Sequence, residues 1–110
     1  MNNFMIIDGY RAVIQYNPDL EMFRGEFTGL NGGGDFYADS VAKLREEGQV
    51  SLRVFLEACR ERGIAPTKSY SGKLQVRLPE ELHKNAVDAA MAKGQSLNQF
   101  VVTAVNGQVN

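Results

Sequence analysis

The stretch that most constrains the fold is GKLQVRLPEEL, residues 72–82, in the last third of the chain. Lys73, Gln75 and Arg77 alternate with leucine and valine, which is the period of a strand that has one polar and one apolar face. Pro79 follows at once, and proline is well suited to the first turn of a helix. The pattern therefore predicts a short strand that stops where a helix begins.

The chain after this strand has the pattern of two short helices. The first has an apolar stripe up to Gly94, a residue suited to the position just past a helix end. Ser96 and Gln99 form a capping-box pattern, which predicts the start of the second helix. The apolar stripes of the two helices are Leu82, Ala86, Ala89 and Ala90, then Leu97, Phe100, Val101, Ala104 and Val105.

A strand and two helices of this size are not expected to be stable alone. Units of ~40 residues usually need disulfides, metals or a partner. Cys59 is the single cysteine and His83 the single histidine, so an internal disulfide and a His/Cys zinc cluster are both excluded. A lone strand also leaves a bare edge. We therefore expect two copies to pair their strands antiparallel and to pool four helices over a common core.

The first part of the chain has a different pattern. Residues 10–17, 21–30 and 35–39 are rich in aromatic and β-branched side chains and are separated by the turn signals NPDLE and NGGGD. They predict a three-stranded antiparallel sheet, with residues 4–7 as the start of its first strand.

A long helix is predicted next, capped by Ser40 and ended by Gly63. Gly48 lies inside it, costs about 1 kcal/mol relative to alanine, and is expected to kink it. The predicted organisation is α+β: a sheet-and-helix domain over 1–63, a linker over 64–71, and a strand-helix-helix domain over 72–110.

Charge is distributed unevenly along the chain. The 110 residues carry a net charge of −1. Residues 1–40 hold two basic and six acidic residues, whereas residues 41–110 hold ten basic and seven acidic ones. The acidic front and mildly basic back suggest two surfaces with different partners. No run approaches the ~18 apolar residues of a membrane span, and the start lacks the pattern of a secretion signal, so we expect a cytoplasmic protein without a membrane partner.

The C-terminal pattern resembles the ribbon-helix-helix fold of Arc- and MetJ-type repressors, through QVRLP and GQSLN. In that family, paired strands form a ribbon that lies in the DNA major groove. The resemblance implies that Lys73, Gln75 and Arg77 contact bases. It also implies that the start of the second helix binds a DNA phosphate, through Gly94, Ser96, Leu97 and Asn98. The implied dimer core is Leu74, Val76, Leu78, Leu82, Phe100 and Val101.

Nearly the whole chain resembles HicB-type antitoxins of type II toxin–antitoxin pairs, through YRAVIQYN, FRGEFTGL, DSVAKLREE, FLEACRERGIAP, KSYSGKLQVRLPEELH and SLNQFV. The resemblance implies that the N-terminal domain is a truncated RNase H-like sheet and helix that binds a small, basic, HicA-type mRNA-cleaving toxin. It also implies that a homodimer or higher oligomer represses its own operon by binding operator DNA. The acidic front is consistent with a cationic partner.

Two other functions remain open at this stage. The chain could be a dimeric protein-interaction module that binds no DNA, or a residual RNase H-like nuclease that uses Asp8, Asp19, Asp35 and Asp39. Those four residues fall at turns and strand ends without evident convergence, whereas metal-dependent catalysis needs clustered carboxylates. We therefore expect no enzyme activity, catalytic residue, metal or cofactor, and we expect Cys59 to be a core residue.

Overall fold

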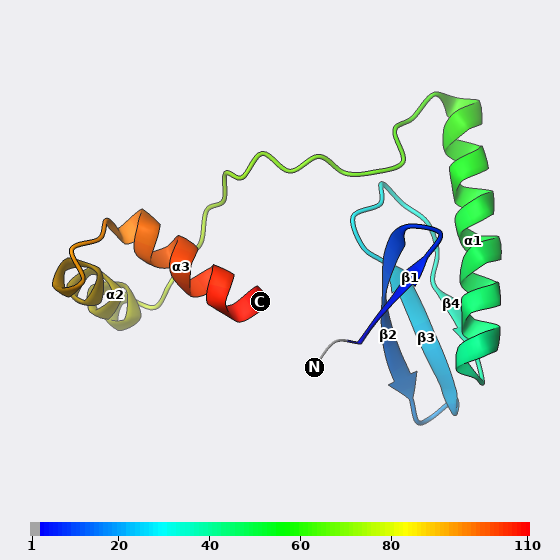
Figure 1. The fold of residues 1–110 in the computed structure, drawn as a ribbon, viewed down its shortest axis with the longest axis horizontal. Helices are drawn as coiled ribbons and strands as arrows, with labels where there is room; N and C mark the ends of the chain where they lie inside the picture. Colours follow the sequence, from blue (N-terminus) through cyan, green and yellow to red (C-terminus); the bar gives the residue numbers. More distant parts are fainter. Residues whose placement is uncertain (1–2) are drawn as a thin grey trace. The chain divides into compact units, whose positions relative to one another are not determined.

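The computed structural model describes residues 3–110, and its contacts divide them into two units (Figure 1). The N-terminal unit ends at Ser71 and the C-terminal unit is Gly72–Asn110. The elements of the first are β1 (Phe4–Ile7), β2 (Tyr10–Asn17), β3 (Met22–Phe27), β4 (Phe36–Ala38) and α1 (Val41–Arg62). Those of the second are α2 (Glu80–Ala92) and α3 (Leu97–Val109). The predicted α+β class is confirmed.

The sheet of the N-terminal unit has four strands, so the prediction of three is wrong. Residues 4–7 form a separate strand because Asp8 and Gly9 have φ angles of 49° and 86° and turn the chain back on itself. All neighbouring strands are antiparallel in the order β1-β2-β3-β4. Residues 10–17, predicted to be a strand from their alternation, form β2 with the same bounds.

Helix α1 packs on the sheet, and the core lies between them. Each strand contributes every second residue to this core, as the two-residue period of a strand requires. Leu44 and Leu52 are the helix residues that penetrate deepest. The buried cluster consists of Met5, Ile7, Ala12, Leu30, Phe36, Ala38, Leu44 and Leu52.

The predicted ends of α1 are confirmed. The Ser40 side chain accepts a hydrogen bond from the backbone N–H of Lys43 at 3.2 Å. At the other end, Gly63 has a left-handed φ of 66°, and the N–H of Ile64 donates to the carbonyl of Cys59 at 2.9 Å. These caps satisfy backbone groups that have no partner inside the helix. Cys59 is buried, as expected of a core residue.

Gly48 allows α1 to approach the sheet closely. A Cβ atom at this position would lie 2.5 Å from Cδ1 of Ile7 and 2.9 Å from Cε2 of Phe36. The Phe36 ring also occupies the place that a Cβ atom of Gly25 would take on β3. The helix is continuous from Val41 to Arg62 (Figure 1). The glycine that appeared to weaken the helix is therefore required by packing.

The change Gly48→Ala tests this packing. Alanine normally stabilises a helix by about 1 kcal/mol relative to glycine, but overpacking against Ile7 and Phe36 is expected to reverse the sign. We expect the free energy of unfolding, measured by denaturant titration, to fall by about 1–3 kcal/mol. Gly34→Ala is the control, because a Cβ atom there meets nothing within 4 Å. Equal stability of the two variants would contradict the packing role.

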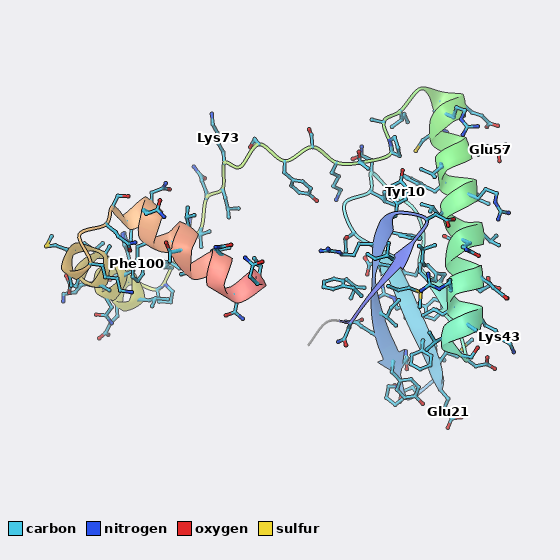
Figure 2. The ribbon with its side chains drawn as sticks, in the orientation of Figure 1. Tyr10, Glu21, Lys43, Glu57, Lys73 and Phe100 are labelled. Carbon is cyan, nitrogen blue, oxygen red and sulfur yellow. The ribbon has the colours of Figure 1, made fainter. Side chains whose placement is uncertain are left out.

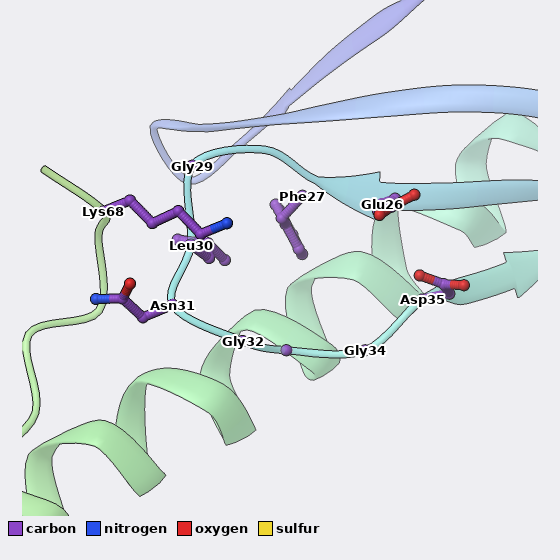
Figure 3. A pocket seen from close by; sticks show the side chains of 10 residues that line it. Glu26, Phe27, Gly29, Leu30, Asn31, Gly32, Gly34, Asp35 and Lys68 are labelled. Atoms are coloured by element: carbon purple, nitrogen blue, oxygen red, sulfur yellow. The ribbon is translucent and has the colours of Figure 1, made fainter. Parts of the chain in front are cut away.

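The first part of the predicted linker is bound to the N-terminal unit (Figure 3). The Asn31 N–H donates to the carbonyl of Pro66 at 2.9 Å, and the Lys68 N–H donates to the carbonyl of Gly29 at 2.8 Å. The side-chain amide of Asn31 donates to the carbonyls of Ala65 and Thr67 at 2.9 and 3.1 Å. Residues 65–68 thus form a strap across the loop that joins β3 to β4.

The C-terminal unit contains the two predicted helices. Pro79 lies at the N-cap of α2, one position before the predicted first turn, and makes no side-chain cap. Gly94, with a φ of 67°, follows the C-cap Lys93, as predicted. Ala90 is buried, and its carbonyl accepts a hydrogen bond from the Gln95 N–H at 2.9 Å. Within residues 3–110, no helix is both long and apolar enough to span a membrane.

Candidate nucleic-acid interface

The predicted base-reading residues Lys73, Gln75 and Arg77 all lie on open chain immediately before α2 and are exposed (Figure 2, which labels Lys73). The strand predicted over 72–78 is not among the strands of residues 3–110. A strand without a neighbour leaves its N–H and carbonyl groups to water. Pairing with a second copy, which the sequence predicts, would give such a strand a neighbour, and this pairing stays a prediction.

The residues predicted to form a dimer core are largely uncovered in one copy. Leu74 and Val76 are 82% and 64% exposed, and Leu82 and Val101 are 52% and 39% exposed. Leu78 and Phe100 are half-buried. In the described C-terminal unit, Ala90 is the one hydrophobic residue that is buried. Exposed large apolar side chains such as these are candidates for an interaction surface.

The start of α3 has the geometry of a helix N-terminus with unused donors. The Ser96 hydroxyl accepts from the Gln99 N–H at 3.0 Å, so the predicted cap is confirmed. The Gln99 side chain instead donates to the Thr103 hydroxyl at 3.2 Å, so the reciprocal half of the capping box is replaced by this forward bond. The N–H groups of Leu97 and Asn98 come before the first N–H that donates to a backbone carbonyl within the helix. They lie at its N-terminus, which is the positive end of the helix dipole. Such a terminus can accept an anion.

Arg24 changes how the acidic charge of the N-terminal unit is distributed. Its guanidinium donates to Asp35 at 2.8 and 2.6 Å and to Glu26 at 3.1 Å. The hydrogen bond to Asp35 is the main cause of a pKa of Arg24 that is raised above its ordinary value. Two of the six carboxylates in residues 1–40 are therefore paired on the sheet. The acidic excess falls on the turns at the ends of the sheet, where Asp8, Asp19 and Glu21 lie.

The acidic residues do not converge into a metal site. Across residues 3–110, no group of three or more histidine, cysteine, aspartate or glutamate side chains is placed to hold a metal ion. Asp35 is engaged by Arg24, and Asp39 pairs with Lys43 at 3.5 Å. Sequence reasoning missed the Arg24 cluster and the Asn31 strap, because both depend on side-chain bonds between residues that are far apart in sequence. The one local signal for the strap was Asn31, which stands directly before the glycine run.

The described residues form two units: a sheet-and-helix unit, and a second unit in which an exposed segment without regular structure precedes two helices. Residues 55–105 match the family model of the HicB family. The match extends from the last turns of α1 through the strap and into α3. No curated protein and no solved structure matches the chain.

Proposed function

We propose that this protein is an antitoxin that neutralises a small, basic, HicA-type mRNA-cleaving toxin with its N-terminal unit and represses its own operon with its C-terminal unit. The observation that carries the proposal is the match of residues 55–105 to the HicB family, which includes the segment 72–79 and most of both C-terminal helices. The acidic excess of the first 40 residues supports a cationic partner for the N-terminal unit.

Repression follows from the chemistry of the C-terminal unit once two copies pair. Two antiparallel copies of residues 72–78 would form a ribbon whose apolar face packs Leu74, Val76 and Leu78 on the helices. The opposite face would present Lys73, Gln75 and Arg77 twice over. Arginine can donate two hydrogen bonds to guanine, and glutamine can pair with adenine in the same way. The amides at the start of α3 would hold a phosphate and fix the register of the ribbon.

A binding titration with DNA from immediately upstream of the reading frame tests repression. We expect the purified protein to bind as a dimer or a larger assembly, with affinity that falls steeply as salt rises because phosphate contacts release counterions. Unrelated DNA of equal length is the control and should bind at least tenfold more weakly at about 150 mM salt. Absence of binding at low salt would favour the alternative, a dimeric interaction module that does not touch DNA.

The antitoxin half is tested separately by co-expression. The product of the adjacent reading frame, expected to be a small basic protein, should arrest growth alone and lose this effect when the antitoxin is present. The two proteins should purify as one complex. An adjacent product that neither arrests growth nor binds would refute this half of the proposal and leave the DNA-binding half to its own test.

A further inference from the structure

An open apolar groove lies at one end of the N-terminal unit. The edge strand β1 is shorter than its neighbour: its pairing with β2 ends at Val13, whereas β2 remains paired with β3 as far as Asn17. Helix α1 packs on β1, β3 and β4. The end of β2 therefore has little cover, and a cavity of about 700 Å³ opens there. The side chains that form its apolar walls are Phe4, Ile14, Tyr16, Phe23 and Val41.

The groove has a firm floor and accessible walls. Tyr16 and Phe23, from neighbouring strands, are in edge-to-face contact with ring centroids 5.4 Å apart. Tyr16 is nevertheless 55% exposed, and Val41, at the first turn of α1, is 58% exposed. Aromatic residues that are held rigid yet remain exposed are typical anchors of protein interfaces, because little side-chain entropy is lost when a partner covers them.

Carboxylates surround this end of the unit. Asp19 and Glu21 lie in the turn between β2 and β3, and Asp39 follows β4 directly. Lys43 pairs with Asp39 at 3.5 Å, and both side chains of this pair are solvent-exposed. Figure 2 shows Glu21 and Lys43 at this same end. Three carboxylates against this one lysine leave the rim net acidic.

We propose that this groove is where the toxin docks, through a segment that places an apolar side chain between Tyr16 and Val41 and flanking lysine or arginine residues against the acidic rim. This assignment rests on the proposed antitoxin function. The charge of the rim favours a basic partner over a second copy of this chain, since two copies would bring their carboxylates together.

Matched substitutions on α1 test the docking site in the full-length protein. Val41→Lys puts a cation into the groove, whereas Val54→Lys makes the same change at another exposed valine of the same helix, 64% exposed and far from the groove lining. We expect Val41→Lys to weaken binding of the adjacent-frame product by about tenfold or more, and Val54→Lys by less than about twofold. Affinity is measured by calorimetry, and operator binding should be unchanged in both variants.

A second pair of variants distinguishes a loss of binding from a loss of folding. Tyr16→Ser removes an anchor from the groove, and Tyr37→Ser removes a tyrosine from β4, outside the groove lining. We expect the first variant to bind the partner much more weakly than the second, at equal helix content by circular dichroism. Equal losses within both pairs, or a loss with Val54→Lys alone, would overturn the docking site while leaving the antitoxin function intact.

Two further outcomes separate failure of the docking site from failure of the antitoxin function. A smaller assembly for Val41→Lys with unchanged toxin affinity would mean that a second copy occupies the groove, which also overturns the assignment. If the unaltered protein fails to bind the adjacent-frame product, the antitoxin proposal itself fails, and the docking site fails with it.

Discussion

With Gln75 and Arg77 both changed to alanine, we expect operator DNA to bind about 100-fold or more weakly than it binds the unaltered protein. A good bidentate contact to a base discriminates by about 1–3 kcal/mol, and a two-fold ribbon presents each residue twice. Both side chains are exposed in one copy, so their truncation should leave the unit folded. The measurement is a DNA titration at fixed salt, with sedimentation to verify that the assembly is intact.

Lys84→Ala is the matched control for this experiment. Lys84 lies on α2 of the same unit and pairs with Asp88 at 3.3 Å across an exposed turn of helix. Its removal lowers the charge of the unit as Arg77→Ala does, so a loss common to both would reflect only general attraction to phosphate. If the double variant kept both affinity and sequence preference, base reading by this segment would be wrong.

The second large effect concerns stability. Leu44 has no exposed surface and lies at the centre of the core between α1 and the sheet. Leu44→Ala should lower the free energy of unfolding by about 2–5 kcal/mol, because it removes buried methyl groups and leaves a cavity. That loss is a large fraction of the about 5–15 kcal/mol typical of small domains, so toxin neutralisation should also become temperature-sensitive.

Val54→Ala on the same helix provides the comparison. Val54 is exposed, and alanine is the better helix former, so its change should stay within about 0.5 kcal/mol of the unaltered protein. Denaturant titrations of both variants, followed by far-ultraviolet circular dichroism, give the two free energies. A loss below about 1 kcal/mol for Leu44→Ala would show that the core relaxes around this site.

Local patterns in the sequence predicted most of the secondary structure correctly. The alternation in residues 10–17 gave β2, and Ser40, Gly63 and Ser96 marked helix ends that the structure confirms. These signals work because caps and strand faces depend on residues that are close in sequence. Residues 4–7 were predicted as the start of the first strand, and their separation as β1 also had a local signal: an Asp-Gly pair between two apolar runs is typical of a tight hairpin.

Other features could not be predicted because they depend on contacts across the fold or between molecules. Gly48 has a poor intrinsic helix propensity, and the positions of the Ile7 side chain and the Phe36 ring explain its presence. The segment 72–78 has the alternation of a strand but is not one of the strands of residues 3–110. The groove at the end of β2 arises from a difference in length between paired strands, which alternation alone does not reveal.

The strap also decides where the chain can be cut. Gly63 ends α1 and looks like a natural domain boundary. A fragment that stopped there would lose the carbonyls that accept from Asn31 and the Lys68 N–H that donates to the Gly29 carbonyl. It would also remove Thr67, which pairs with Leu30 at the edge of the core. A protease acting on the native protein should therefore spare residues 65–68, whose backbone is hydrogen-bonded to residues 29–31. A fragment that keeps the strap must therefore extend at least to Lys68, and the N-terminal unit itself ends at Ser71.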